Sequence, residues 1–183
     1  NYLITMNKLI NYRGPDNNGL FLSNKFMFGH NRLTIVDNSV TANQPFTSTT
    51  SRSIIIFNGE IYNFKFLRKK ALSAGYKFKT FSDTEVIVAV YEIWGIDGLD
   101  ILEGMYVFSI YDRIKNILII RRDKFGIKPF YYRFLNDKFY GSSELLPLLK
   151  INNEETINSK ALGSIFLFDN NCFEESLVNG IKK

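Results

Sequence analysis

The sequence predicts an α+β fold in which helices cover antiparallel β-sheet. Aromatic residues make up 15% of the 183 residues, with 17 Phe and 10 Tyr, and flat rings favour the pleated, half-buried surface of a sheet. Two central segments each carry a single apolar helical stripe, and strand-like segments stand before and after them. Because a helix with one apolar face must bury it against another element, these segments are expected to form one layered core.

The first part of the chain contains a helix, a hairpin and a long polar stretch. Apolar residues at helical spacing predict a helix over Asn1–Asn11. Short apolar runs over Leu20–Ser23 and Phe26–Asn31 predict a hairpin. The polar stretch Val36–Arg52 is expected to be a loop, and unstructured loops of that length are usually functional. Ser53–Phe57 then reads as a buried strand, since it is mostly β-branched and aromatic.

The two central helices are predicted over Asn63–Ala74 and Asp83–Trp94. The second opens with the sequence SDTE at 82–85, which is the pattern of a capping box. From Met105 the spacing changes to that of strands, and short turns separate four of them in an antiparallel run. These strands are expected over Met105–Asp112, Ile117–Asp123, Pro129–Phe134 and Lys138–Ser143.

Composition and charge exclude several classes of protein. Hydrophobic residues at 45% and charged residues at 22% are ordinary values for a globular domain. The net charge is +5, but the cations are scattered, the densest groups being 68–70 and 121–122, so neither a nucleic-acid nor a membrane partner is expected. Apolar runs are too short to span a bilayer, and no signal peptide is visible. A basic nucleic-acid binder remains an alternative that rests only on net charge.

Cysteine and histidine usage limits the chemistry further. Cys172 is the single cysteine, which excludes an intramolecular disulfide and predicts a reducing, cytoplasmic compartment. His30 is the single histidine, and a lone histidine without cysteines nearby does not predict a metal site. No metal and no cofactor are therefore expected in this chain.

The sequence FNGEIYN at 57–63 has two interpretations. Asn-Gly between apolar runs is a strong hairpin signal, because a type I′ turn needs positive φ at both positions. Alternatively, the Asn58 amide and the Gly59 N–H are donors toward an oxyanion, with Glu60 beside them for a substrate ammonium. From this motif alone, the hairpin is favoured.

Arg32 and Asp83 are further candidates, each with a simpler alternative. Arg32 leaves a strand and enters a long loop, where its guanidinium could hold a carboxylate through two parallel contacts. A surface arginine explains it equally well. Asp83 is explained locally, because an anion in the first turn of a helix is favoured by the helix dipole.

Taken together and in order, eight motifs resemble the glutaminase domain of glutamine-hydrolysing asparagine synthetases. The resemblance extends over about residues 1–150, which we expect to be the glutaminase domain. Residues 151–183 are then expected to be a linker and the beginning of a synthetase domain. The motifs are RGPDNNG, GHNRLTIVD, QPF, FNGEIYN, SDTEVI, GMYVFSIYD, RRDKFGIKPFYY and SSE.

The resemblance implies a fold, a substrate and a set of residue roles. The fold is that of an N-terminal-nucleophile hydrolase, an αββα sandwich of antiparallel sheets between helical layers, and the substrate is L-glutamine. Arg32 matches the residue that clamps the α-carboxylate of glutamine. Leu33, Thr34, Ile35 and Val36 match the backbone that lines the pocket. Asn58 and Gly59 match the oxyanion donors, and Glu60 and Asp83 match the carboxylates that hold the α-ammonium.

The nucleophile of that family is not in this chain. The resemblance implies an N-terminal cysteine on a strand before the first helix, whereas only twelve residues precede Arg13 and none is cysteine. Cys172 lies far along the chain and has no free α-amine, so it does not replace the nucleophile. The chain is therefore expected to bind glutamine without hydrolysing it.

Two hypotheses follow for the function. In the first, the chain is the ammonia-supplying part of an asparagine-synthetase-like enzyme, whose further domain uses aspartate, ATP and Mg. In the second, it is a non-catalytic glutamine-binding or interaction module derived from the same fold. The identity of the ammonia acceptor and the oligomeric state are not predicted.

Overall fold

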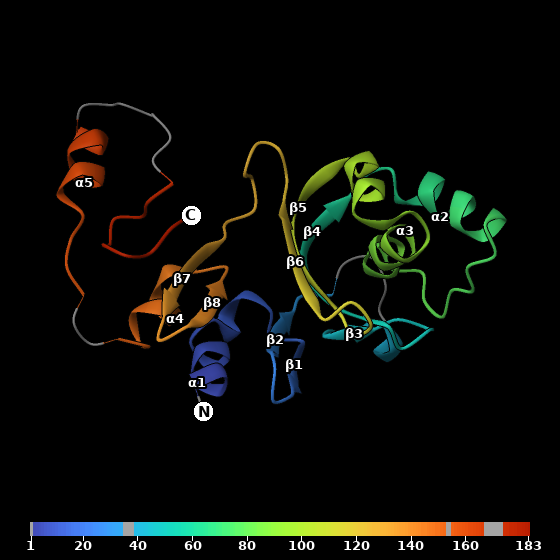
Figure 1. The fold of residues 1–183 in the computed structure, drawn as a ribbon, viewed down its shortest axis with the longest axis horizontal. Helices are drawn as coiled ribbons and strands as arrows, with labels where there is room; N and C mark the ends of the chain where they lie inside the picture. Colours follow the sequence, from blue (N-terminus) through green and yellow to red (C-terminus); the bar gives the residue numbers. More distant parts are fainter. Residues whose placement is uncertain (1, 35–38, 153–154, 167–173) are drawn as a thin grey trace. The chain divides into compact units, whose positions relative to one another are not determined.

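The computed structural model describes residues 2–34, 39–152, 155–166 and 174–183 (Figure 1). The chain divides into two compact units. The larger unit is Asn11–Lys128, and the smaller unit combines Asn1–Ile10 with Pro129–Lys183. Each unit has a hydrophobic cluster of its own.

A four-stranded antiparallel sheet forms the centre of the larger unit. Its strands, in order, are β3 (Phe46–Thr47), β4 (Ser53–Ile61), β5 (Gly104–Asp112) and β6 (Ile117–Arg122). β4 and β5 are nine residues long and pair over their whole length. The three long strands predicted next to the central helices therefore lie in one sheet, which confirms that expectation.

Both central helices are present, and they lie on one side of this sheet (Figure 1). They are α2 (Phe64–Ser73) and α3 (Asp83–Gly98), with the short 3-10 helix η3 (Leu99–Ile101) after α3. α3 continues past Trp94, with a kink at Gly95, where φ is 75°. Apolar side chains of both helices are buried in the same cluster as those of β4 and β5. The cluster includes Leu67, Val86, Ile87, Val90, Phe57, Phe108 and Ile110.

The predicted capping box at the start of α3 is only half confirmed. Ser82 Oγ accepts from the Glu85 N–H at 3.3 Å, as a helix cap should. The Glu85 carboxylate does not return to the Ser82 N–H, which instead donates to Thr80 Oγ1 at 3.2 Å. Glu85 is fully buried and accepts from the backbone N–H groups of Lys79 and Thr80. It therefore fixes the segment that leads into α3.

The predicted hairpin near the start of the larger unit is also present. It consists of β1 (Asn17–Leu22) and β2 (Met27–Arg32), preceded by the 3-10 helix η1 (Asn11–Arg13). The turn closes through the Ser23 N–H, which donates to the Phe26 carbonyl at 3.1 Å. β2 ends at Arg32, so this arginine does stand where the strand passes into the next segment.

The expectation of an unstructured loop from Val36 to Arg52 is wrong in part. Residues 36–38 lie outside the described residues, but η2 (Val40–Ala42) and β3 follow. Phe46 is buried and pairs with Ile55 of β4. An apolar residue within the polar stretch is therefore enough to add a short edge strand to the sheet.

The smaller unit contains α1 (Tyr2–Leu9), β7 (Tyr131–Leu135), β8 (Lys138–Ser142), α4 (Leu145–Leu149) and α5 (Ser159–Phe166). β7 and β8 form a separate two-stranded sheet. The four strands expected as one antiparallel run are thus divided between two sheets. The reason lies in the segment after β6, where the Asp123 carboxylate accepts from the backbone N–H groups of Phe125, Ile127 and Lys128. These bonds form a compact loop in place of a hairpin turn.

The smaller unit is held together by residues from distant parts of the sequence. Its cluster contains Met6, Leu148, Ile151 and Ile181, and Ile181 is fully buried. Part of the segment predicted to be a linker therefore packs into a core, while the proposed boundary at residue 150 stays a prediction. In the described part of the chain, no helix is both long and apolar enough to cross a membrane.

Candidate functional site

Asn58 and Gly59 lie inside β4 and not in a turn. Asn58 is opposite Val107 of β5, and Gly59 is opposite Tyr106. After Ile61 the chain leads into α2. The hairpin interpretation of the Asn-Gly pair is therefore wrong, because nonlocal pairing with β5 overrides the local turn preference.

Glycine is required at position 59 by the close approach of β5. A Cβ atom there would stand 2.1 Å from the Met105 carbonyl oxygen and 2.7 Å from Tyr106 Cα. The φ of Gly59 is 152°, which L side chains rarely adopt. The space where a side chain would stand at position 59 is thus filled by the backbone of β5.

The outer edge of β4 presents three alternate N–H groups. Two of them have partners: the Phe57 N–H donates to Gln44 Oε1 at 2.6 Å, and the Ile61 N–H donates to Asp83 Oδ2 at 3.2 Å. In an antiparallel strand every second N–H points the same way, so the Gly59 N–H faces this edge between the other two. Among the described residues, neither this N–H nor the Asn58 amide has an acceptor at this edge. We call residues 57–61, with Gln44 and Asp83, the edge frame.

Asp83 and Glu60 lie at one end of the edge frame. Asp83 is buried and Glu60 is exposed. Burial raises the pKa of the Asp83 carboxyl above its ordinary value, backbone N–H groups led by that of Ile61 oppose the rise, and the negative charge of Glu60 adds to it. The two carboxylates are therefore close enough to repel each other. A cation between them would relieve that repulsion.

Arg32 is buried, with 8% of its surface exposed, so the interpretation as a surface arginine is wrong. Its Nη1 donates to the Ser39 carbonyl at 2.9 Å and to Asn43 Oδ1. The adjoining backbone is held by Asp16, whose N–H donates to the Arg32 carbonyl at 3.0 Å. Asp16 Oδ2 also accepts from the Thr34 N–H at 2.8 Å. Asp16, in the RGPDNNG motif, is thus a positioning residue that the sequence did not reveal.

The other predicted pocket residues are only partly described. Leu33 is exposed and Thr34 is half-buried, and both follow β2 directly. Ile35 and Val36 lie outside the described residues, as does Cys172. The structure brings Asn58, Gly59, Glu60 and Asp83 to one edge. Whether Arg32 shares a pocket with them stays a prediction.

His30 connects β2 with the strand that carries Asn58. Its Nε2 lies 3.1 Å from the Phe57 carbonyl, and since a carbonyl only accepts, this nitrogen carries the proton. Burial lowers the pKa of His30 to about 4, partly offset by the bond to Phe57, and the positive charge of Arg32 lowers it further. The imidazole is therefore neutral near pH 7. No group of three His, Cys, Asp or Glu residues able to hold a metal ion occurs in the part of the chain that the structure describes.

Asp123 fixes the loop after β6 to the strand opposite Gly59. Its carboxylate accepts from the Tyr106 N–H at 3.2 Å as well as from the loop. Burial alone would raise the pKa of Asp123, but the backbone N–H donors hold it below its ordinary value. The KFGIK segment is therefore a loop that Asp123 holds in place.

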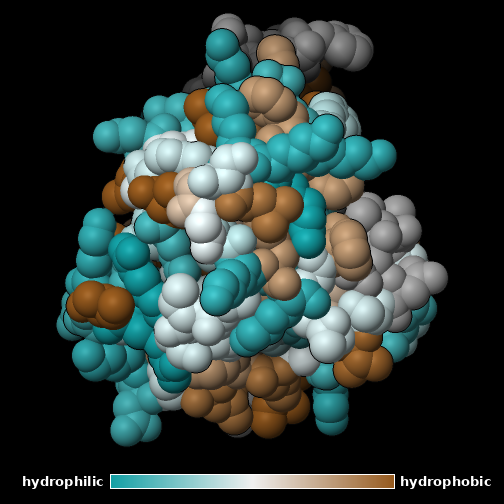
Figure 2. Space-filling view, turned by 90° about the vertical axis from the view of Figure 1, so that its right-hand side faces the viewer, coloured by the Kyte–Doolittle hydropathy of each residue, from teal (hydrophilic) through white to brown (hydrophobic). Residues whose placement is uncertain are grey.

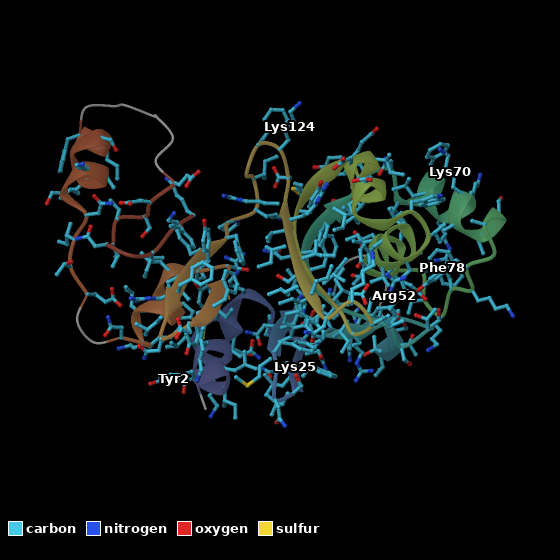
Figure 3. All side chains as sticks on the ribbon, in the orientation of Figure 1. Tyr2, Lys25, Arg52, Lys70, Phe78 and Lys124 are labelled. Carbon is cyan, nitrogen blue, oxygen red and sulfur yellow. The ribbon has the colours of Figure 1, made fainter. Side chains whose placement is uncertain are left out.

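Cations of α2 lie on aromatic rings. The Arg68 guanidinium lies 4.0 Å from the centroid of Phe78, and Lys70 Nζ lies 4.6 Å from that of Phe66. Phe78 and Lys70 are labelled in Figure 3. Hydrophilic and hydrophobic residues are interspersed on the face shown in Figure 2. Long cationic side chains that lie along aromatic rings, as in α2, are ordinary features of a solvated surface.

An open groove of about 310 Å³ lies elsewhere in the larger unit. None of its lining residues belongs to the predicted glutamine site. They are Thr50, Arg52, Ala74, Gly75, Tyr76, Glu92, Ile93 and Ile114.

Comparison with solved structures defines the fold class. The chain matches glutamine phosphoribosylpyrophosphate amidotransferase from B. subtilis with a TM-score of 0.55 and 25% identity, over 66% of this chain and 28% of that one. A structure described as an allosteric regulatory enzyme of purine biosynthesis gives a TM-score of 0.53 at 24% identity, over 66% of this chain and 28% of that one. The predicted α+β fold of the N-terminal-nucleophile hydrolase type, with antiparallel sheets and helices, is confirmed.

The chain belongs to the glutamine amidotransferase domain family, whose model matches residues 1–183. It is 40% identical to asparagine synthetase [glutamine-hydrolyzing] 1 of Bacillus subtilis, over 89% of this chain and 26% of that protein. It is 37% identical to asparagine synthetase B of Escherichia coli, over 81% of this chain and 26% of that protein. The chain thus spans about a quarter of the length of these two relatives, and the resemblance stated from its motifs is confirmed.

Proposed function

We propose that this chain forms the glutamine-recognition site of an asparagine-synthetase-like amidotransferase. Its family and the glutamine-hydrolysing enzymes among its relatives support this proposal. So does the charge pattern, in which the buried cation Arg32 suits the α-carboxylate and the acidic pair of Glu60 and Asp83 suits the α-ammonium. The pocket beside Arg32 would be lined by the backbone of Leu33, Thr34, Ile35 and Val36.

The observation that carries the proposal is the position of the Gly59 N–H in the edge frame. It lies two residues from the Ile61 N–H that Asp83 accepts from, or about 7 Å along an extended strand. A glutamine whose ammonium meets Glu60 and Asp83 could extend its carboxamide along the strand toward Gly59. There the Gly59 N–H and the Asn58 amide would stabilise the negative charge that develops on the carboxamide oxygen during acyl transfer.

We propose further that the 183-residue polypeptide binds glutamine without turning it over. Attack on the carboxamide needs a nucleophile that forms a covalent intermediate. The single cysteine of the chain is Cys172, which is not an N-terminal residue. In a complete enzyme of this kind, an N-terminal thiolate would release ammonia, and a synthetase domain using aspartate, ATP and Mg would consume it. No cofactor is proposed for this chain itself.

Calorimetric titration of the 183-residue chain with L-glutamine tests the proposal. We expect weak, saturable binding that Asp83→Asn and Arg32→Met each reduce at least tenfold. Lys138→Met, which removes an exposed cation from β8 in the smaller unit, should leave binding unchanged. Absence of binding by the unaltered chain would overturn the proposal. Ammonia release by that chain would contradict only the part that concerns turnover.

A further inference from the structure

We propose that Gln44 is a positioning residue that fixes the spacing between the Gly59 N–H and Asp83. This inference rests on the proposed function, in which those two groups meet opposite ends of glutamine. Gln44 is the single glutamine of the chain. It stands in the QPF motif and is buried, with 7% of its surface exposed.

The amide of Gln44 joins the strand to the helix. Its Oε1 accepts from the Phe57 N–H at 2.6 Å, which fixes the orientation of the amide because an N–H can only donate. Its Nε2 then faces Thr84 Oγ1 at 3.3 Å. Thr84 follows Asp83 in α3, and Phe57 precedes Asn58 in β4. One side chain thus connects both halves of the proposed site.

With this bond the edge frame forms a closed circuit around the Gly59 N–H. The Gln44 side chain is hydrogen-bonded to Thr84, which is next to Asp83 in the chain. Asp83 accepts from the Ile61 N–H, and the backbone of β4 connects Ile61 to Phe57, whose N–H donates to Gln44. Without Gln44, the link through Thr84 would be lost, and the bond from the Ile61 N–H to Asp83 Oδ2 at 3.2 Å would remain to hold this strand to the start of α3. Closing the circuit therefore limits how far Asp83 can move relative to Gly59.

The backbone of Gln44 is packed against β1, and the residue before it is hydrogen-bonded to Arg32. A Cβ atom at Gly19 of β1 would stand 1.8 Å from the Gln44 carbonyl oxygen, so only glycine permits this approach. The residue before it, Asn43, accepts from Arg32. The segment 39–44 therefore contacts the strand of the oxyanion donors, the helix of Asp83 and the guanidinium of Arg32. A structural role confined to one element does not explain contacts with all three.

The test compares L-glutamine with glutaramate, which is glutamine without its α-ammonium. In the proposed site, the ammonium is the only part of the ligand that Asp83 contacts, so the ratio of the affinities for the two ligands measures how well Asp83 is placed. We expect the unaltered chain to prefer L-glutamine and Gln44→Met to reduce this ratio about tenfold, the effect of losing one hydrogen bond in a buried network. General loosening of the fold would weaken both ligands equally and leave the ratio unchanged, which would overturn the proposal.

Thr84 provides a second variant in case Gln44→Met does not fold. Thr84→Val removes the acceptor of Gln44 Nε2 but leaves the bond to Phe57, and we expect it to lower the ratio as well. Thr84→Ser keeps the hydroxyl, so its affinity ratio should equal that of the unaltered chain.

A double variant gives a further test. In an Asp83→Ala background, Gln44→Met should have no further effect on the ratio, and an additive effect would contradict the inference. If the unaltered chain binds neither ligand, the proposed function fails and this inference falls with it. If it binds glutamine and the ratio never changes, only the inference fails.

Discussion

Tyr91 and Asp112 share a buried hydrogen bond in which the tyrosine hydroxyl donates to Asp112 Oδ2 at 2.7 Å. The Arg52 guanidinium, whose position near α3 is labelled in Figure 3, donates to the same oxygen through Nε and Nη2. Burial alone would raise the pKa of Asp112, but these donors and two backbone N–H groups hold it well below its ordinary value. This network joins the middle of α3 to the end of β5.

Removing the Tyr91 hydroxyl should therefore weaken the larger unit. We expect Tyr91→Phe to lower the free energy of unfolding by about 1–3 kcal/mol, because a buried carboxylate loses a donor. Urea denaturation followed by circular dichroism measures the change. Tyr62→Phe is the matched control, since Tyr62 is 60% exposed, and it should be neutral. Equal effects of the two substitutions would show that the network does not contribute to stability.

The pKa of His30 can be read directly, because it is the only histidine. Burial lowers its pKa to about 4 in the folded state, against an ordinary value near 6.5 in the unfolded chain. Its C2 proton resonance should therefore titrate near pH 4 in the native protein and near 6.5 in urea. A native titration midpoint above 6 would contradict the partly buried, neutral imidazole.

The same shift has a consequence for stability. Because the unfolded chain binds this proton more readily, the contribution of His30 to stability is complete above pH 6.5 and declines as the pH falls toward 4. At full extent the loss is about 3 kcal/mol. We expect His30→Asn to lack this decline between pH 6.5 and 4. If the free energy of unfolding changed with pH in the same way in the unaltered chain and in His30→Asn, the predicted contribution of His30 would be contradicted.

Glycine at position 59 should be indispensable. Gly59→Ala would place a methyl group 2.1 Å from the Met105 carbonyl oxygen, and we expect loss of more than about 3 kcal/mol or failure to fold. Gly163→Ala is the control. Gly163 lies in α5 with open space around it, so alanine should leave stability unchanged or raise it by up to about 1 kcal/mol. Thermal unfolding of both variants is sufficient to compare them.

Asp16 should affect glutamine binding from a distance. Asp16→Ala removes the acceptor of the Thr34 N–H, which lies two residues beyond Arg32. We expect glutamine affinity to fall by about tenfold with little change in unfolding free energy, since Asp16 itself is exposed. Asp97→Ala, an exposed carboxylate near the end of α3, should leave affinity unchanged. Calorimetric titration of both variants checks this.

Local patterns in the sequence predicted the elements whose causes are local. The apolar stripes of α2 and α3 and the unbroken β-branched run of β4 are visible within ten or so residues. The length of β4 could not be predicted in this way. Asn58-Gly59 signals a turn, and only the pairing with Val107 and Tyr106, almost fifty residues away, keeps the strand extended.

The candidate site shows the same limit. Arg32, Glu60 and Asp83 were found through motifs in a known order, whereas Gln44 and Asp16 were not assigned roles. Gln44 acts through residues 13 and 40 positions away, and Asp16 through one 18 positions away. The chemistry of an amide or a carboxylate does not indicate which distant N–H it will meet. Such positioning residues become visible only when the backbone is placed.

The core of the smaller unit also determines when it can form during synthesis. Met6 belongs to the same buried cluster as Leu148 and Ile181, so the core that α1 joins is complete only after Ile181 has been synthesised. The larger unit is one uninterrupted segment and can fold as soon as residue 128 has emerged. At a usual elongation rate of about 5–20 residues per second, the roughly 170 residues between α1 and Ile181 take about 10–30 s to synthesise, and Met6 lacks these partners for that time.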